Sequence, residues 1–204
     1  MPGVIRILLA DDQHLVRGAL AALLALEDDF EVVASVADGA EAVQAAIEHR
    51  PDVALLDVEM PRLDGVAATR EIVTRAPGVR VMILTTFGRP GYLRRAMDAG
   101  ARGFMVKDAP PDRLAAAVRQ VHLGRTVVDP ALAVASLSSG ANPLTEREAD
   151  ALRAAEDGGT VADIARTLIL SEGTVRNYLS AAIGKTGART RAEAARVARE
   201  NGWL

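Results

Sequence analysis

The chain has 204 residues and a formal net charge of −3, with half of its residues hydrophobic, a quarter charged and no cysteine. This length allows one or two domains with their own cores, and the lack of cysteine excludes disulfides, thiolate metal sites and a cysteine nucleophile. The N-terminal residues lack the layout of a signal peptide, and no apolar run approaches the ~18 residues of a membrane helix. We therefore expect a cytoplasmic protein with no membrane insertion.

The first 123 residues alternate between apolar, strand-like runs and segments with helical periodicity. Strands are expected at about 5–10, 31–37, 53–56, 79–84 and 102–106, and helices at about 15–26, 40–49, 66–75, 92–99 and 111–123. Strands that alternate with helices predict a parallel sheet with right-handed crossovers. The expected fold is an α/β domain around a five-stranded parallel sheet.

Asp57 is the residue around which this half is organised. It follows the apolar run 53–56 and precedes Met60-Pro61, which places it at the carboxyl end of a central strand, where open α/β sheets bind their ligands. Other polar residues also come directly after predicted strands: Asp11, Asp12, Thr85 and Lys107. Because the carboxyl ends of parallel strands share one edge, all five side chains should converge on one pocket.

The residue types in this pocket indicate phosphoryl chemistry. Clustered carboxylates repel one another and require a cation, and ligation by oxygen alone suits Mg²⁺. The expected ligands are Asp11, Asp12, Asp57 and the main-chain carbonyl of Glu59. Asp57 would be the nucleophile that accepts a phosphoryl group, Lys107 would pair with a phosphoryl oxygen, and the Thr85 hydroxyl would donate to another.

Several of these residues form a known pattern. Asp11-Asp12, Asp57, Met60-Pro61 with Asp64-Gly65, Thr85 and Gly103-Phe104-Met105-Val106-Lys107 resemble the receiver domain of bacterial response regulators, over residues 4 to about 123. The resemblance implies a (βα)5 flavodoxin-like fold and phosphorylation of Asp57 by a sensor histidine kinase. It also implies a switch in which Thr85 moves toward the phosphoryl group and Phe104 reorients, although an aromatic near a strand end is more commonly just part of the core.

The composition changes after residue 124. The segment 125–142 has few charges and contains Ser138-Ser139-Gly140, which is typical of a linker, with a short helix expected over 130–137. This predicts three parts: a receiver domain at 1–124, a linker at 125–142 and a second domain at 143–204.

The second domain is expected to consist of four short helices, at about 146–156, 161–168, 172–184 and 191–200. A Thr followed three residues later by an acid marks three of the starts: Thr145/Glu148 and Thr190/Glu193 are expected capping boxes, and Thr160/Asp163 is a variant with Asp. Ser171 is expected to cap the remaining helix. Three residues, 169–171, join the second helix to the third, which is the spacing of a helix-turn-helix motif. Basic charge is concentrated from residue 171 to residue 191, as in a DNA-reading segment.

This half resembles LuxR-type DNA-binding domains, through 144–148, 163–165, 171–180 and 187–191. With the receiver, the whole chain is similar to the NarL/FixJ class of response regulators, and 85–92 with 173–178 are similar to the DesR-type regulators of membrane-lipid desaturation. The resemblance implies that Arg176, Asn177 and Ser180 face the DNA major groove, and that Thr174, Lys185, Arg189 and Arg191 contact phosphates. Gly184 and Thr186 depart from the family pattern, so we expect weak DNA binding by a monomer.

The combined interpretation is a transcription factor that forms a homodimer on phosphorylation and binds double-stranded DNA at a two-fold operator. One alternative is a regulator that binds DNA without phosphorylation. A second is a phosphatase with Asp57 as nucleophile and Glu59 as general acid, which the lack of an inserted cap region disfavours. A third is a receiver that acts only as a phosphate sink or protein partner, which the intact helix-turn-helix half disfavours.

Overall fold

The structure, a computed structural model, describes residues 3–86, 90–138, 142–156 and 158–204. The chain divides into two compact units, one made of Met1–Gly88 with Tyr92–Ala133 and the other mainly of Val134–Leu204. Among the described residues, no helix combines the length and the apolar character needed to span a bilayer.

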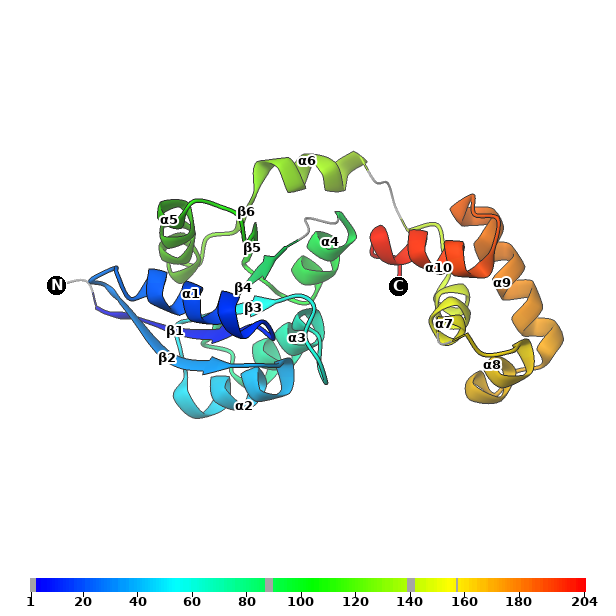
Figure 1. Cartoon of the computed structure of the whole chain (residues 1–204), viewed down its shortest axis with the longest axis horizontal. Coiled ribbons are helices and arrows are strands. Elements are labelled where there is room, and N and C mark those ends of the chain that lie inside the picture. Colours follow the sequence, from blue (N-terminus) through cyan, green and yellow to red (C-terminus); the bar gives the residue numbers. More distant parts are fainter. Residues whose placement is uncertain (1–2, 87–89, 139–141, 157) are drawn as a thin grey trace. The chain divides into compact units, whose positions relative to one another are not determined.

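The described residues of the first unit form a six-stranded parallel sheet in the order β2-β1-β3-β4-β5-β6, with helices on both faces (Figure 1). The strands are β1 Ile5–Ala10, β2 Phe30–Val36, β3 Val53–Asp57, β4 Arg80–Thr85, β5 Gly103–Val106 and β6 Val127–Val128. The helices are α1 His14–Leu24, α2 Gly39–His49, α3 Gly65–Arg75, α4 Pro90–Asp98 and α5 Pro111–His122. The expected α/β class is confirmed, and the sheet has one strand more than the expected five.

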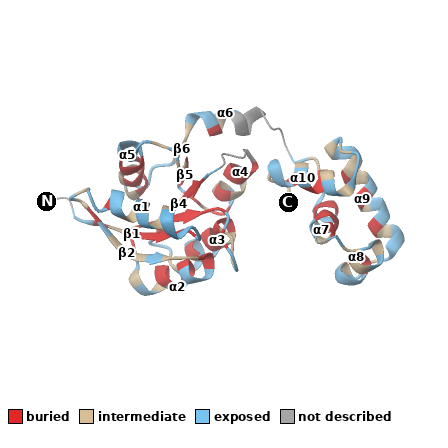
Figure 2. Cartoon of the chain, in the orientation of Figure 1, coloured by how far each residue is buried: buried red, intermediate tan, exposed pale blue. Residues whose placement is uncertain are grey.

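The core of this unit lies in two layers, one on each face of the sheet. One layer joins inward side chains of the strands to α2, α3 and α4, and the other joins them to α1 and α5. All five residues of β3 are buried, and Figure 2 shows the buried residues concentrated in the strands and on the inner helix faces. Because β3 is covered on both sides, its last residue, Asp57, sits on a rigid support.

The second unit contains α7 Glu146–Ala155, α8 Val161–Leu168, α9 Glu172–Thr186 and α10 Arg191–Glu200 around a separate apolar core. The helix expected over 130–137 is present as α6 Pro130–Ser138, which begins within the first unit. Ser139 and Gly140 of the expected flexible stretch lie outside the described residues.

The caps of these helices agree with the sequence in all but one detail. Capping boxes form at Thr145/Glu148 and Thr160/Asp163, and Ser171 caps α9. Thr190 also caps α10, but the Glu193 carboxylate accepts a hydrogen bond from the Arg189 N–H instead of the Thr190 N–H. The box expected there is therefore wrong, because the Glu193 carboxylate bonds to the N–H of the residue before Thr190.

Candidate functional site

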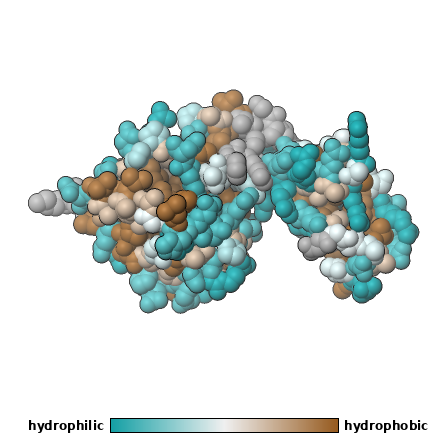
Figure 3. Space-filling model, in the orientation of Figure 1, coloured by the Kyte–Doolittle hydropathy of each residue, from teal (hydrophilic) through white to brown (hydrophobic). Residues whose placement is uncertain are grey.

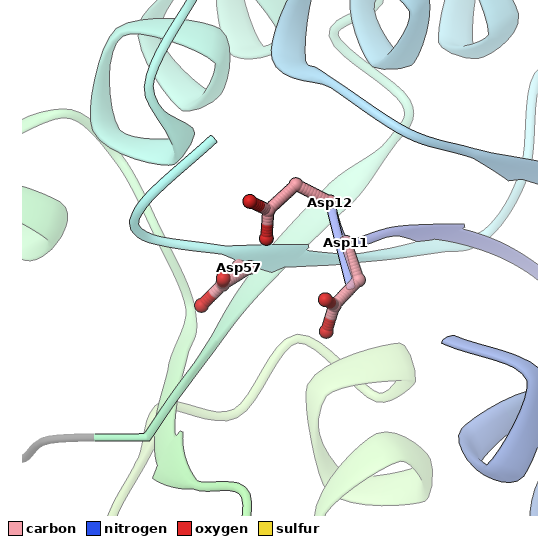
Figure 4. Close-up of side chains that lie close together, drawn as sticks. All are labelled: Asp11, Asp12 and Asp57. Atoms are coloured by element: carbon pink, nitrogen blue, oxygen red, sulfur yellow. The ribbon is translucent and has the colours of Figure 1, made fainter. Parts of the chain in front are cut away.

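Three carboxylates meet at the carboxyl edge of the sheet. Asp11 and Asp12 follow β1 directly and Asp57 ends β3, and these two strands are hydrogen-bonded neighbours. One carboxylate oxygen from each residue lies within 4.8 Å of the others (Figure 4). Asp11 and Asp57 are buried, whereas Asp12 is exposed at the mouth of the cluster.

Lys107 places one ammonium against two of these carboxylates. Its side chain is buried directly after β5, with Nζ 2.7 Å from Asp11 Oδ2 and 3.1 Å from Asp57 Oδ2. The Lys107 N–H donates to the Thr85 carbonyl at 2.8 Å, which ties this lysine to the end of β4. Since these four side chains comprise three carboxylates and one ammonium, the cluster has an excess of negative charge that favours a cation.

Asp57 is held in one orientation. The N–H of Val58 donates to its Oδ1 at 2.8 Å, so that Oδ2 is the oxygen that faces Lys107. Burial raises the pKa of Asp57 from 3.8 to about 6, although the Lys107 ammonium acts to lower it. A buried carboxylate with a perturbed pKa and a fixed orientation is typical of a functional group.

The residues present fit a magnesium ion. Asp11, Asp12 and Asp57 supply oxygen donors close enough to share one ion, and Mg²⁺ uses one or two carboxylates and retains several waters. The side chain of Glu59 is engaged elsewhere: its Oε1 accepts a hydrogen bond from the Tyr92 hydroxyl at 3.1 Å. The role of the Glu59 main-chain carbonyl stays a prediction.

The two expected switch residues lie on β4 and β5. Thr85 is buried at the end of β4, and Phe104 is completely buried in β5. The close-packed surroundings of Phe104 fit the core interpretation of this aromatic, and they also mean that any reorientation of its ring would disturb its neighbours.

Gly65 belongs to the receiver-like sequence pattern, and the structure shows that it also packs against the backbone of Asp57. It is the first residue of α3, and its N–H donates to the Val58 carbonyl at 2.9 Å. A Cβ atom at this position would lie 1.9 Å from the Asp57 carbonyl oxygen, so any side chain would displace the end of β3. The sequence shows the Asp64-Gly65 pair only as part of this pattern, because the close backbone approach depends on tertiary packing.

Arg62 also supports the loop after Asp57. It adopts a left-handed conformation with φ of 64°, and its guanidinium pairs with Asp38 and with Glu41 at 2.8 Å, near the start of α2. Asp38 at the same time caps α2 by accepting from the Glu41 N–H. The loop between β3 and α3 is therefore clamped to a neighbouring helix.

The second unit presents the expected reading face on α9. Arg176, Asn177 and Ser180 are exposed, whereas Val175 and Leu179 on the opposite side are buried in the core. The Arg176 guanidinium pairs with Glu172 at 2.6 Å, one turn earlier on the helix surface. Exposed Arg and Asn side chains on one helix face have the chemistry to read guanine and adenine edges.

The expected phosphate-contacting residues fall into two groups. Arg189 is exposed and Thr174 is half-buried near the start of α9, where its hydroxyl lies 2.8 Å from Ser171 Oγ. Arg191 is half-buried and donates to the Gly159 carbonyl at 2.8 Å, and Lys185 pairs with Glu148 at 2.7 Å.

Glu148 is a buried carboxylate with two partners. Burial acts to raise its pKa, but hydrogen bonds from Lys185 and from Thr145 together hold that pKa below its usual value. Lys185 thus has a structural partner within the chain, whatever further contact it makes.

Comparisons with known proteins agree with both halves. Residues 7–119 match the family described as response regulator receiver domain, and residues 142–198 match that of bacterial regulatory proteins, luxR family. The chain is 44% identical to the uncharacterized transcriptional regulatory protein YvfU and 42% identical to the transcriptional regulatory protein DesR, both of Bacillus subtilis. Each alignment covers 98% of this chain and 100% of the relative.

A solved structure extends this similarity to the whole fold. The crystal structure of the response regulator ChrA, from a heme-sensing two-component system, is 34% identical with a TM-score of 0.59, and the match covers 99% of this chain and 100% of ChrA. The receiver and helix-turn-helix architecture is thus the one found in this relative.

Proposed function

Because the chain belongs to the two-component response regulators that join a receiver domain to a LuxR-type DNA-binding domain, and is a transcriptional regulator and not an enzyme, we propose that phosphorylation of Asp57 by a sensor histidine kinase switches its binding to DNA. In this proposal the receiver comprises residues 1–124, the linker 125–142 and the DNA-binding domain 143–204.

The geometry around Asp57 carries this proposal. Its Oδ2 faces the Lys107 ammonium at 3.1 Å, and two further carboxylates stand beside it. In the proposed transfer, an Asp57 oxygen forms a bond to phosphorus while the phosphorus–nitrogen bond of the kinase phosphohistidine breaks and the imidazole leaves with the electron pair. Mg²⁺ bound to Asp11, Asp12, Asp57 and the Glu59 carbonyl would neutralise charge, and Lys107 and Thr85 would bind phosphoryl oxygens.

Phosphorylation would act through the residues at the ends of β4 and β5. It adds about −1.5 to −2 charges and new acceptor oxygens, which is enough to reorder a loop through new hydrogen bonds. Thr85 would move toward the phosphoryl group. The Phe104 ring would then turn into the space that Thr85 leaves.

The proposed output is a homodimer on DNA. The first and last receiver helices are the interface that the resemblance to DesR-type regulators implies. Hydrophobic side chains gather on the exposed surface over α1 (Figure 3). Leu15 of this helix is 85% exposed, and Leu26, just after the helix, is 77% exposed. Two copies would then place two α9 helices in half-sites about one helical turn apart.

Membrane-lipid desaturation genes are the proposed targets. The support is the resemblance of 85–92 and 173–178 to DesR-type regulators and the 42% identity to DesR. Residues 87–89 of the first segment lie outside the described residues, so this part of the proposal depends on sequence.

Sedimentation velocity tests the switch. Wild type and Asp57→Ala would be compared in Mg²⁺ with and without beryllofluoride, which binds an aspartate carboxylate as a phosphoryl analogue. We expect a shift from monomer to dimer in wild type alone. No shift, or the same shift in both proteins, would favour a regulator that binds DNA independently of phosphorylation.

A further inference from the structure

An arginine of α1 is bonded to the backbone between two of the expected metal ligands. Arg17 is half-buried, and its Nη1 donates to the Asp11 carbonyl at 2.6 Å. This carbonyl belongs to the peptide group that joins Asp11 to Asp12. Because a peptide group is planar, a bond that fixes its oxygen also restricts the orientation of the residues on both sides. Arg17 therefore acts on two expected ligands through one backbone oxygen.

The two ligands differ in how else they are held. The Asp11 carboxylate accepts from the Gln13 N–H at 2.9 Å through Oδ1, and its Oδ2 lies 2.7 Å from the Lys107 ammonium. The Asp12 side chain is exposed, and among the described residues no hydrogen bond or ion pair holds it. The two side chains leave the backbone in different directions (Figure 4). The direction of the Asp12 carboxylate thus depends on the peptide group that Arg17 holds.

We propose that Arg17 is a positioning residue of the metal site, which holds this peptide group so that the Asp12 carboxylate is directed at the ion. The inference rests on the proposed function and adds a residue to it. A guanidinium suits the task, because it stays charged and donates from a rigid, planar group. Partners that orient a ligand without touching the metal typically change metal affinity by about 10–100-fold.

The charge of Arg17 gives the proposal a sign that can be measured. Among the residues that the structure describes, no carboxylate forms an ion pair with Arg17. A cation beside a metal site repels the metal, so by charge alone the removal of Arg17 would strengthen metal binding. If Arg17 orients the ligands, its removal weakens metal binding instead.

Electron paramagnetic resonance of free Mn²⁺, with Mg²⁺ as competitor, measures the affinity on the full chain. Arg17→Met removes the guanidinium and should weaken Mg²⁺ binding by about tenfold, whereas Arg17→Lys keeps the charge and should weaken it by a smaller factor. Arg70→Met, which removes an exposed arginine of α3, is the control and should stay within about twofold of wild type. Unchanged or tighter binding in both Arg17 variants, or an equal loss in Arg70→Met, would overturn the proposal.

Beryllofluoride-induced dimerisation separates positioning from a general defect in folding. It would be followed by sedimentation velocity at rising Mg²⁺ concentration. Arg17→Met should need about tenfold more Mg²⁺ for half-maximal dimerisation and should reach the wild-type plateau at saturating Mg²⁺. A lower plateau with an unchanged Mg²⁺ midpoint would contradict positioning, because added metal compensates for a misdirected ligand but not for a damaged interface or fold.

Asp57→Ala separates a failure of this inference from a failure of the proposed function. Weaker Mn²⁺ binding in Asp57→Ala, together with unchanged binding in both Arg17 variants, would overturn the role of Arg17 and leave the proposed function standing. Equal Mn²⁺ binding in wild type and Asp57→Ala would remove the metal site from the proposed function, and the role of Arg17 with it.

Discussion

Replacement of Asp57 by asparagine should stabilise the metal-free protein at neutral pH, although it removes the proposed phosphoacceptor. Burial raises the pKa of Asp57 from 3.8 to about 6, with Lys107 opposing the rise. The folded chain holds this proton more tightly than the unfolded chain, so the free energy of unfolding falls as pH rises from about 4 to about 6. At about 1.4 kcal/mol per tenfold change in proton affinity, the ionised carboxylate destabilises the fold above pH 7 by at most about 3 kcal/mol.

Urea unfolding in EDTA measures this effect separately in the two domains. Pulse-labelling hydrogen exchange of β3 and β4 peptides reports the receiver, and the fluorescence of Trp203, the single tryptophan of the chain, reports the DNA-binding unit. Asp57→Asn should raise the receiver's free energy of unfolding by about 1–3 kcal/mol near pH 7.5 and by less than about 1 kcal/mol near pH 4.5. The Trp203 transition should not change.

Two further comparisons make the test specific. Asp28→Asn, which neutralises an exposed carboxylate of the same unit, should leave the receiver's stability unchanged at both pH values. Mg²⁺ should stabilise wild type more than Asp57→Asn, because the variant lacks one charged ligand. The argument that burial raises the pKa of Asp57 would be contradicted if Asp57→Asn did not raise the receiver's free energy of unfolding near pH 7.5, or raised it equally at both pH values.

Three substitutions of single residues test other parts of the structure. Gly65→Ala should lower the receiver's free energy of unfolding by about 1–3 kcal/mol and abolish the dimerisation expected with beryllofluoride, since its Cβ would overlap the Asp57 carbonyl; Gly78→Ala, with nothing within 4 Å of its Cβ, is the control in both assays. Gly184→Ala fills open space on α9 and should stabilise the DNA-binding unit by about 0.5–1 kcal/mol, measured by Trp203 fluorescence in urea. Lys185→Met should destabilise that unit by about 1–2 kcal/mol near pH 7, with a smaller loss as Glu148 becomes protonated in acid; a loss independent of pH would contradict the ion-pair argument.

The convergence of Asp11, Asp12, Asp57 and Lys107 could be predicted because each residue follows an apolar run. A buried parallel strand is recognisable from sequence, and the carboxyl ends of parallel strands share one edge, so position along the chain determines position in space. Helix starts were equally predictable where the cap is local, as at Thr145 and Thr160. These features depend on residues that are close together in the chain or on the sheet topology.

The short strand β6 and the internal partners of two basic residues could not be predicted in this way. β6 is two residues long, too short to show a periodicity, and it forms because the edge of β5 is available for pairing. Lys185 pairs with Glu148 from 37 residues away, and Arg191 bonds to Gly159 across 32 residues. Such pairings depend on how the helices pack, and a basic residue that stabilises the fold has the same sequence pattern as one that binds a phosphate.

These internal partners bear on how tightly one copy of the chain can bind DNA. The pair of Arg176 with Glu172 is exposed and worth only about 0.3–0.5 kcal/mol, so DNA can displace Glu172 easily. Lys185 is different, because its release would leave the buried Glu148 carboxylate without its cation. If α9 reads bases as proposed, the Arg176 side chain is readily available for that contact, whereas Lys185, one of the proposed phosphate contacts, is already paired within the fold. Two linked modules gain effective concentration without any new contact, so the proposed dimerisation would raise the occupancy of DNA although each copy binds it weakly.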